Sequence, residues 1–319
     1  MGCGYDMWFA SISRVAPWSM ILDAVGVPLL LGSKTHTKWK ITKRINSGLR
    51  ISSILPVVFL MFFFAGPAAA VDFFDGIRAS RGLYFLSYSS LYRADRITGP
   101  GGHTEISDYG FLRAEQILRL CYYSPDYVFN LLVPFGGSRT DQPNASSYGI
   151  GDIWLGTGTF LPFREVDALF MFSAKLPTGK YSVNDSVNFG SNQIDLSPGL
   201  FVHKIIADFS FDAAVKYYFK LENHDTDTDP GDEVHLQLLL GYEFADGIRA
   251  GPALNWIYGK NKEIGGRSVP GSARQLLSAG GEIYFKISSW AITLNYLHDA
   301  YSENSTRGDY FKIKLCHKL

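Results

Sequence analysis

Charge is scarce in this chain, and neither sign is in excess. Charged residues make up 19% of its 319 residues, and 30 Lys and Arg balance 30 Asp and Glu. Soluble proteins carry about 25% charged residues, and a protein that holds a polyanion needs a cationic surplus. The composition therefore disfavours disorder, coiled coils and helix bundles, and it predicts no nucleic-acid partner.

Cysteine is rare, and no glycine cluster has the flanking strand and helix of a phosphate-binding loop. Cys3, Cys121 and Cys316 show neither a CxxC pair nor the Cys/His spacing of a zinc site. This spacing excludes a zinc module and a disulfide framework. The glycines at residues 99–102 and 265–266 do not stand between a strand and a helix, as phosphate binding requires. We therefore expect no cofactor.

Only one long apolar run dominates the chain, at residues 54–65 (ILPVVFLMFFFA). Five basic residues stand between positions 38 and 50, and Gly-Pro-Ala-Ala-Ala follows the run at residues 66–70. This order is typical of a secretory signal peptide, and the run is shorter than the roughly 20 residues of a membrane-spanning helix. We expect cleavage after Ala70, so that residues 1–37 form an upstream extension, residues 38–70 the signal peptide and residues 71–319 the exported protein.

In the expected exported part, apolar and polar side chains alternate with a period of two, which places them on opposite faces of a strand. Residues 208–221 show it best, because Phe209 and Phe211 lie on one face while Asp212 and Lys216 lie on the other. Twelve such segments are centred near residues 84–92, 109–121, 127–135, 150–160, 166–175, 194–203, 208–220, 234–244, 248–258, 276–285, 290–298 and 311–319.

The connections between these segments alternate between long and short. The long ones are residues 95–107, 136–148, 177–192, 222–231, 259–274 and 299–308, and the short ones are near residues 124–126, 161–164, 205–208, 245–247 and 286–289. Long loops at one end and tight turns at the other are the pattern of outer-membrane barrels. We therefore predict an all-β fold, a twelve-stranded antiparallel transmembrane β-barrel of the outer-membrane type. A soluble barrel shows the same alternation, but a lumen of twelve strands is too wide for aliphatic side chains to fill.

Five motifs in order resemble a known bacterial family. They are ASRGLYFLSYSSLYRADRI at residues 79–97, GDIWLG at 151–156, LPTGKY at 176–181, FGSN at 189–192 and TDPGDEVH at 228–235. Together they resemble the family named for the meta-pathway of phenol degradation. The chain departs from that pattern at Gln237, where an acidic residue is expected, and at the last residue, Leu319, where an aromatic one is expected.

The resemblance implies an outer-membrane barrel that helps hydrophobic or aromatic compounds cross the bacterial outer membrane. No plug domain and no energy-coupling motif is evident in the sequence, so we expect a passive channel. The expected partners are outer-membrane lipid, a small hydrophobic or aromatic solute and, during biogenesis, the barrel-assembly machinery. A phospholipase-like barrel hydrolase and a structural or adhesive barrel are the alternatives. No catalytic residue is expected, because His298 lies at the rim and no Ser-His-Asn grouping emerges from the strands.

Polar residues with inward parity are the candidates for lining the lumen, where charges tune solute selectivity. They are Arg113, Glu115, Arg119, Asp152, Trp154, Lys175, Asp212, Lys216, Lys220, Glu233, His235, Glu243, Lys312 and Lys314. A polar lumen also needs such residues simply to remain solvated and paired, so each one has this plainer explanation as well.

Two local features lead to further expectations. The acidic stretch at residues 223–233 begins like a calcium loop, but Pro230 and Leu236 stand where such a loop needs Gly and a bidentate Glu. We therefore expect a solvated hairpin loop with no metal, and an incidental external calcium site is the alternative. Pro198 and Pro252 fall within expected strands, where proline interrupts the ladder of hydrogen bonds. A break of this kind would suit a lateral opening for a hydrophobic solute.

Overall fold

The computed structural model describes residues 71–319, which form sixteen β-strands and one short 3-10 turn, η1 (Pro100–Gly102). The expected signal peptide and upstream extension lie outside the described residues. The strands are β1 (Gly82–Thr98), β2 (Thr104–Tyr123), β3 (Tyr127–Asp141), β4 (Asn144–Ile150), β5 (Ile153–Phe160), β6 (Asp167–Leu176), β7 (Asp195–Ile206), β8 (Phe209–Lys220), β9 (Thr228–Asp229), β10 (Glu233–Ala245), β11 (Ile248–Gly259), β12 (Glu263–Ile264), β13 (Arg267–Ser268), β14 (Gln275–Ile287), β15 (Trp290–Glu303) and β16 (Ser305–Lys318).

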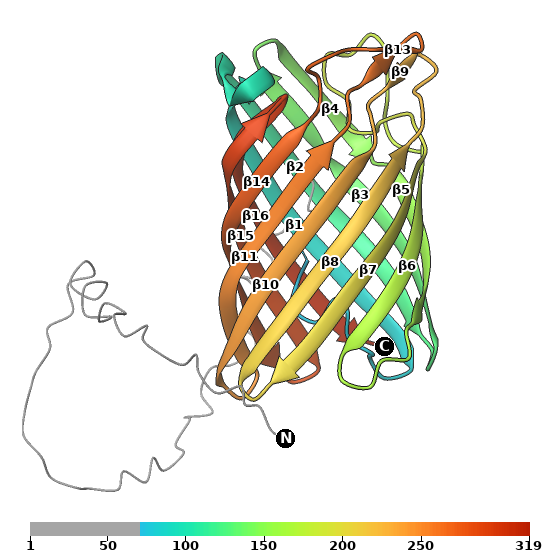
Figure 1. Cartoon of the computed structure of the whole chain (residues 1–319), viewed down its shortest axis with the longest axis vertical. Helices are drawn as coiled ribbons and strands as arrows, with labels where there is room; N and C mark the ends of the chain where they lie inside the picture. The colour runs from blue at the N-terminus through green and yellow to red at the C-terminus, as the bar shows by residue number, and fades with distance from the viewer. Residues whose placement is uncertain (1–70) are drawn as a thin grey trace, which may run out of the picture. The chain divides into compact units, whose positions relative to one another are not determined.

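The long strands close into an antiparallel barrel with twelve strand positions (Figure 1). We call each position a stave, because two successive short strands can occupy one position. Each stave pairs with its neighbours in the sequence, and β1 pairs with β16 from Tyr84↔Lys318 to Thr98↔Ser305 to complete the ring. The strands β3 and β4 form a hairpin, and β4 and β5 share one stave beside β3. The predicted fold class, a twelve-stranded antiparallel barrel, is confirmed.

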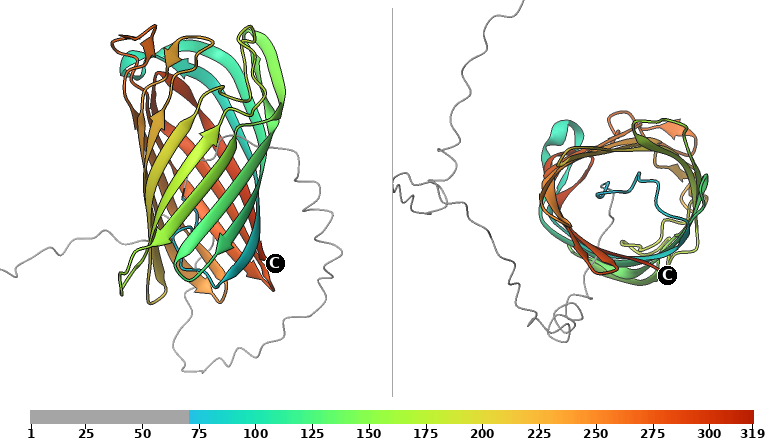
Figure 2. Two further views of the ribbon diagram at one scale, coloured as in Figure 1. Left: turned by 90° about the vertical axis from the view of Figure 1, so that its right-hand side faces the viewer. Right: turned by 90° about the horizontal axis from the view of Figure 1, so that it is seen from below.

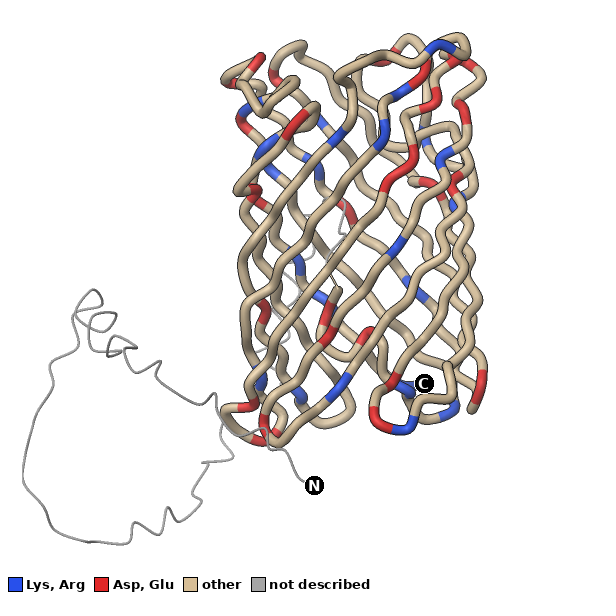
Figure 3. The backbone as a smooth tube through the Cα atoms, in the orientation of Figure 1, with Lys and Arg blue, Asp and Glu red and all other residues tan. Residues whose placement is uncertain are grey.

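Alternation along each strand divides the wall into an apolar outer face and a polar inner face. In β8, Phe209 and Phe211 are exposed on the outside while Asp212 is buried on the inside. In β10, Leu240 is exposed and Gln237 is buried. Figure 3 shows the charged positions gathered toward the two ends of the barrel, with few along the middle of the wall. An apolar outer band around a polar interior is the arrangement that lipid requires.

The two ends of the barrel differ. Five turns join the staves at one end, which we call the short-turn end, and the three longest connections, residues 177–194, 221–232 and 260–274, meet at the other, the long-loop end (Figure 1). The small sheet of β9, β12 and β13 lies among the long loops. No helix among residues 71–319 is long and apolar enough to cross a membrane.

Several connections are shorter than the sequence predicted, because the strands extend further. Only residues 99–103 separate β1 from β2, and a single residue, Asn304, separates β15 from β16. The predicted long loops at residues 95–107, 136–148 and 299–308 are therefore wrong. At the start of β2, residues 104–108 are all exposed. A strand that is exposed to solvent on both faces does not need alternating apolar and polar residues, so the sequence pattern does not predict it.

Two of the three strand prolines, Pro198 in β7 and Pro252 in β11, coincide with gaps in the ladder, whereas Pro134 in β3 stays in register with Ile117. Between β7 and β8 the pairing passes from Leu196 to Gly199 and omits Pro198. Between β10 and β11 it passes from Ala250 to Ala253 and omits Pro252. Proline has no N–H to donate, so these are the interruptions that its chemistry predicts.

Candidate functional site in the barrel lumen

The segment before β1 runs inside the barrel. Seen along the barrel axis, it crosses the space enclosed by the strands (Figure 2, right). Val71, Asp72 and Phe73 are each no more than 2% exposed. We call residues 71–78 the inner segment. It occludes part of the lumen, although no plug was evident in the sequence.

Ion pairs hold the inner segment to the last strand. The carboxylate of Asp72 pairs with the ammonium groups of Lys312 and Lys314, the latter at 3.2 Å, and Asp75 pairs with Lys314 at 3.0 Å. Burial by itself would raise the pKa of Asp72, but the two ammonium groups outweigh this effect and hold the pKa below its usual value. Asp72 is therefore a carboxylate at neutral pH, and it anchors the segment electrostatically.

Backbone hydrogen bonds and ring contacts complete the anchoring. The N–H of Phe73 donates to Oε1 of Glu282 at 2.7 Å, and the N–H of Phe74 donates to Oδ1 of Asp212 at 3.0 Å. The ring of Phe74 lies 5.2 Å from that of His203 and 5.0 Å from that of Tyr284. These contacts reach several staves, so the segment is fixed across the lumen rather than along one strand.

A loop from the opposite end also enters the lumen. Asp152 accepts hydrogen bonds from the N–H of Gly179 (2.9 Å), the N–H of Ser191 (2.8 Å) and the hydroxyl of Ser191 (2.6 Å). Gly179 and Gly190 pass so close that a Cβ on Gly179 would stand 2.7 Å from the Cα of Gly190. We call residues 177–194 the inner loop. Three of the resemblance motifs, at residues 151–156, 176–181 and 189–192, therefore meet at one structural unit.

A break in one stave lets the inner loop bind there. Residues 151 and 152 separate β4 from β5, opposite Pro134 of β3. The N–H of Gly151 donates to the carbonyl of Pro134, and the N–H of Lys180 in the loop donates to the carbonyl of Ile150, both at 2.8 Å. The loop thus uses backbone groups that a continuous strand would direct to β6.

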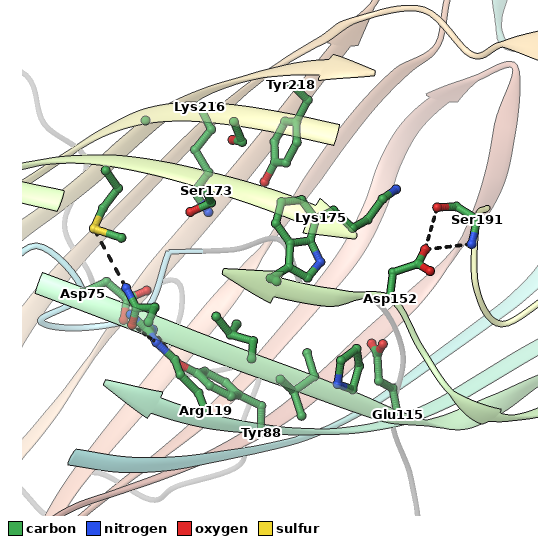
Figure 4. A pocket seen from close by; sticks show the side chains of 18 of the residues that line it. Asp75, Tyr88, Glu115, Arg119, Asp152, Ser173, Lys175, Ser191, Lys216 and Tyr218 are labelled. Carbon is green, nitrogen blue, oxygen red and sulfur yellow. Dashed lines mark hydrogen bonds between the residues drawn. The ribbon is translucent and has the colours of Figure 1, made fainter. Parts of the chain in front are cut away.

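A cavity of about 600 Å³ lies between the inner segment and the inner loop (Figure 4). Its lining combines apolar side chains, among them Ile117, Leu132 and Phe201, with charged ones. Eight of the fourteen predicted residues line it, namely Arg113, Glu115, Arg119, Asp152, Trp154, Lys175, Lys216 and Lys312. This volume lies within the range of small-molecule sites in proteins.

The structure places the other six predicted residues elsewhere. Asp212 bonds His203 (2.7 Å) and the inner segment, and Lys314 bonds Asp72 and Asp75. Lys220 and His235 both contact Glu233, at 2.6 and 2.8 Å, in a separate buried cluster. Glu243 pairs with Arg249 near the short-turn end of β10 and is 35% exposed.

Most charges that line the cavity are paired. Arg113 lies 3.4 Å from Glu115, and Lys175 lies 2.5 Å from Asp195. Arg119 instead donates to the neutral oxygens of Asn130 (2.7 Å) and Tyr88 (2.8 Å). Lys216 lies 5.1 Å from the centre of the Phe201 ring. Neither Arg119 nor Lys216 has a carboxylate at ion-pair distance among residues 71–319.

The described residues do not assemble a metal site or a hydrolase triad. Among residues 71–319, no group of three or more His, Cys, Asp or Glu side chains is placed to hold a metal ion. In the acidic stretch, Asp225 accepts from Asn192 (3.0 Å) and Asp229 from the N–H of Gly231 (2.8 Å). His298 bonds Asp309 at 2.9 Å, and within the described chain no serine bonds to it.

Comparison with solved structures supports the fold. The COG4313 outer membrane channel from Pseudomonas putida F1 superposes with a TM-score of 0.72 at 17% identity, covering 78% of this chain and all of the other. The KdgM porin has a TM-score of 0.43 at 10% identity, covering 74% of this chain and 99% of the porin. The NanC porin has a TM-score of 0.45 at 8% identity, covering 73% of this chain and 100% of the porin. No curated protein sequence matches the chain significantly.

The sequence itself matches a family over most of the described barrel. Residues 94–315, more than half of the chain, match the family described as the MetA-pathway of phenol degradation. This match covers the inner loop and all sixteen strands in whole or in part. It agrees with the family that the five sequence motifs resemble, and the chain belongs to that family.

Proposed function

We propose that the protein is a channel of the bacterial outer membrane that passes small hydrophobic or aromatic solutes by passive diffusion. The observation that carries the proposal is the cavity of about 600 Å³ inside a barrel with an apolar outer face, since its lining includes Trp154, Ile117, Leu132 and Phe201. The Pseudomonas putida F1 barrel that shares this fold is an outer membrane channel, which agrees with the proposal.

The route follows from the two ends of the barrel. Long loops of such barrels face the outside of the cell and short turns face the periplasm. A solute would enter past the inner loop, occupy the cavity and meet the inner segment on the periplasmic side. Passage to the periplasm then requires a shift of the inner segment or an exit through the wall.

Liposome flux tests the proposal. The protein is expressed as the full chain, purified from outer membranes and placed in liposomes, and entry of benzamide is compared with entry of a sugar of similar size. Entry into protein-free liposomes is subtracted for each solute. We expect the aromatic solute to enter faster than the sugar. Equal entry would indicate a general pore, and no protein-dependent entry would contradict a channel.

The same preparation tests the alternatives. A barrel hydrolase would release fatty acid from the liposome phospholipid, and a structural barrel would give neither flux nor lipid turnover. Asp309 engages Nδ1 of His298 as the carboxylate of a triad would, but within residues 71–319 no serine bonds to the ring, so the nucleophile that a hydrolase needs is missing at that surface position.

A further inference from the structure

Two cations in the lumen cavity, Arg119 and Lys216, have no carboxylate at ion-pair distance among residues 71–319, and the Asp75 carboxylate, which is bonded to Lys314, acts on both only at longer range. Arg119 stands on β2 and Lys216 on β8, and β3, β5, β6 and β7 separate these staves on one side of the ring. Figure 4 shows the two side chains reaching into the cavity from opposite walls. Both are partly buried.

The carboxylates of the cavity are engaged by other groups. Asp72 and Asp75 pair with Lys312 and Lys314, and Glu115 pairs with Arg113. The two oxygens of Asp152 accept three hydrogen bonds from the inner loop. An unpaired charge in a partly dehydrated cavity is unfavourable. The wall therefore leaves an open position for an anion.

Arg119 is prepared to receive such an anion. Its Nε donates to Oδ1 of Asn130 at 2.7 Å and its Nη1 donates to the Tyr88 hydroxyl at 2.8 Å, so the guanidinium plane is fixed. The Cys121 thiol is a further hydrogen-bonding neighbour of Arg119. A fixed guanidinium matches the planar geometry of a carboxylate, and less side-chain freedom is lost on binding.

The surroundings of the two cations are apolar. Lys216 lies against the ring of Phe201, and Ile117, Leu132 and Trp154 line the same cavity. We propose that the preferred solute is an amphipathic monoanion, an aromatic or short alkyl carboxylate. Its carboxylate binds Arg119, Lys216 supplies the second cation across the cavity, and its hydrophobic part contacts Trp154 and its apolar neighbours. This inference rests on the proposed channel function.

The first experiment compares benzoate with benzamide, which have similar shape and differ in charge at neutral pH. Calorimetric titration of the purified protein in detergent gives the affinity for each. Hydrogen bonds to charged groups lead us to expect benzoate to bind about tenfold tighter than benzamide. Added salt should weaken benzoate binding and leave benzamide binding unchanged. Equal affinities at low salt would overturn the inference without any variant.

Variants then locate the anion. Arg119→Gln and Lys216→Gln should each weaken benzoate binding about tenfold while benzamide affinity stays within about twofold. Lys286→Gln is the matched control, because Lys286 is exposed beyond the cavity at the short-turn end of β14. The gel mobility of unheated samples shows whether each variant is folded. Equal losses for both solutes would mean a general effect on the cavity and would contradict an anion site.

Flux separates this inference from the channel proposal. If benzoate and benzamide both enter liposomes faster than the sugar but bind equally, the anion inference fails and the channel proposal stands. If neither solute shows protein-dependent entry, the channel proposal fails. Tighter binding of benzoate, lost in the Arg119→Gln and Lys216→Gln variants, supports the anion site in either case.

Discussion

The side chains of Asp72 and Lys312 form an ion pair inside the barrel although 240 positions separate them in the chain. Each of the two side chains is 2% exposed. The pair joins the inner segment, which precedes the first strand, to β16, the last strand. The occlusion of the lumen at the short-turn end therefore depends on a contact between the two ends of the described chain.

Asp72→Asn should release the inner segment. The change removes the Asp72 carboxylate from a buried ion pair, and loss of one partner of such a pair costs about 3 to 5 kcal/mol. We expect a clear rise in single-channel conductance in planar bilayers. Asp246→Asn, in an exposed turn, is the control and should conduct like the unmodified protein. Unchanged conductance in Asp72→Asn would mean that the remaining contacts, the Asp75–Lys314 ion pair and those of Phe73 and Phe74, are enough to hold the segment.

The anchoring of the inner segment by Asp72 should depend on pH only below about pH 4. The pKa of Asp72 in the folded protein lies below its usual value of 3.8. Stability from a lowered carboxyl pKa is fully present above the unfolded value and is lost as the pH falls through the folded value. Conductance should therefore stay constant from pH 7 to about 4 and rise at lower pH.

The neighbouring carboxyl groups make a control necessary for this pH series. Asp75 also bonds Lys314, and Glu282 bonds the backbone of Phe73. The Asp72→Asn variant removes the contribution of Asp72 alone, so the difference between the two pH curves isolates it. A rise that begins near pH 6 in the unmodified protein would show that another group controls the segment.

Asp152→Ala should loosen the inner loop. The carboxylate accepts three hydrogen bonds from Gly179 and Ser191, and a hydrogen bond to a charged group contributes about 1.5 to 3 kcal/mol. We expect faster entry of a sugar into liposomes, because the constriction at the long-loop end widens. Asp185→Ala changes an exposed carboxylate of the same loop and should leave sugar entry unaltered. The same rate in both variants would contradict this role of Asp152.

An arginine introduced on the outer face should destabilise the barrel more when it lies near the middle of the bilayer than when it lies near the bilayer surface. Leu240 is exposed near the middle of β10, and Phe244 is exposed near its short-turn end. Arginine costs about 2 to 4 kcal/mol at the middle of a bilayer and about 0 to 1 near its surface. Urea unfolding in lipid vesicles should therefore show a larger loss for Leu240→Arg than for Phe244→Arg. Equal losses would contradict a membrane-spanning orientation of β10.

Pro252→Val tests an exit through the wall. Valine restores an N–H at the position where the β10–β11 ladder is interrupted, and it favours strand pairing. We expect slower uptake of a hydrophobic solute if it leaves through this gap. Pro198→Val makes the same change at the β7–β8 gap and shows which of the two interruptions matters. Unchanged uptake in both variants would exclude these gaps as the route.

The sequence predicts the wall of the barrel well, because the period of two assigns each residue to one face. Phe209 and Phe211 face outward and Asp212 faces inward for this reason alone. The same parity brings eight of the fourteen candidates, Lys216 among them, to the cavity. Parity does not reveal partners, so it could not show that Lys175 is paired while Lys216 is not.

The inner segment and the inner loop could not be predicted in this way. Residues 71–78 are too short for a periodic pattern, and the partners of Asp72 lie at the other end of the chain. The aromatic and acidic residues directly after the expected cleavage site were the only local signal. The position of the inner loop depends on the break between β4 and β5 at residues 151 and 152. The small and polar residues around this break look the same in the sequence as those of an ordinary loop, so the break could not be predicted.

The pairing of β1 with β16 also sets an order of events during biogenesis. Lys312 and Lys314 stand on β16, the last strand of the barrel, so the binding site of the inner segment is incomplete until β16 has been made. Once β1 and β16 have paired, the segment lies inside the closed ring of twelve staves. Closure of the barrel and occlusion of its lumen by the inner segment thus occur in one step, and a barrel that lacks β16 cannot occlude its lumen in this way.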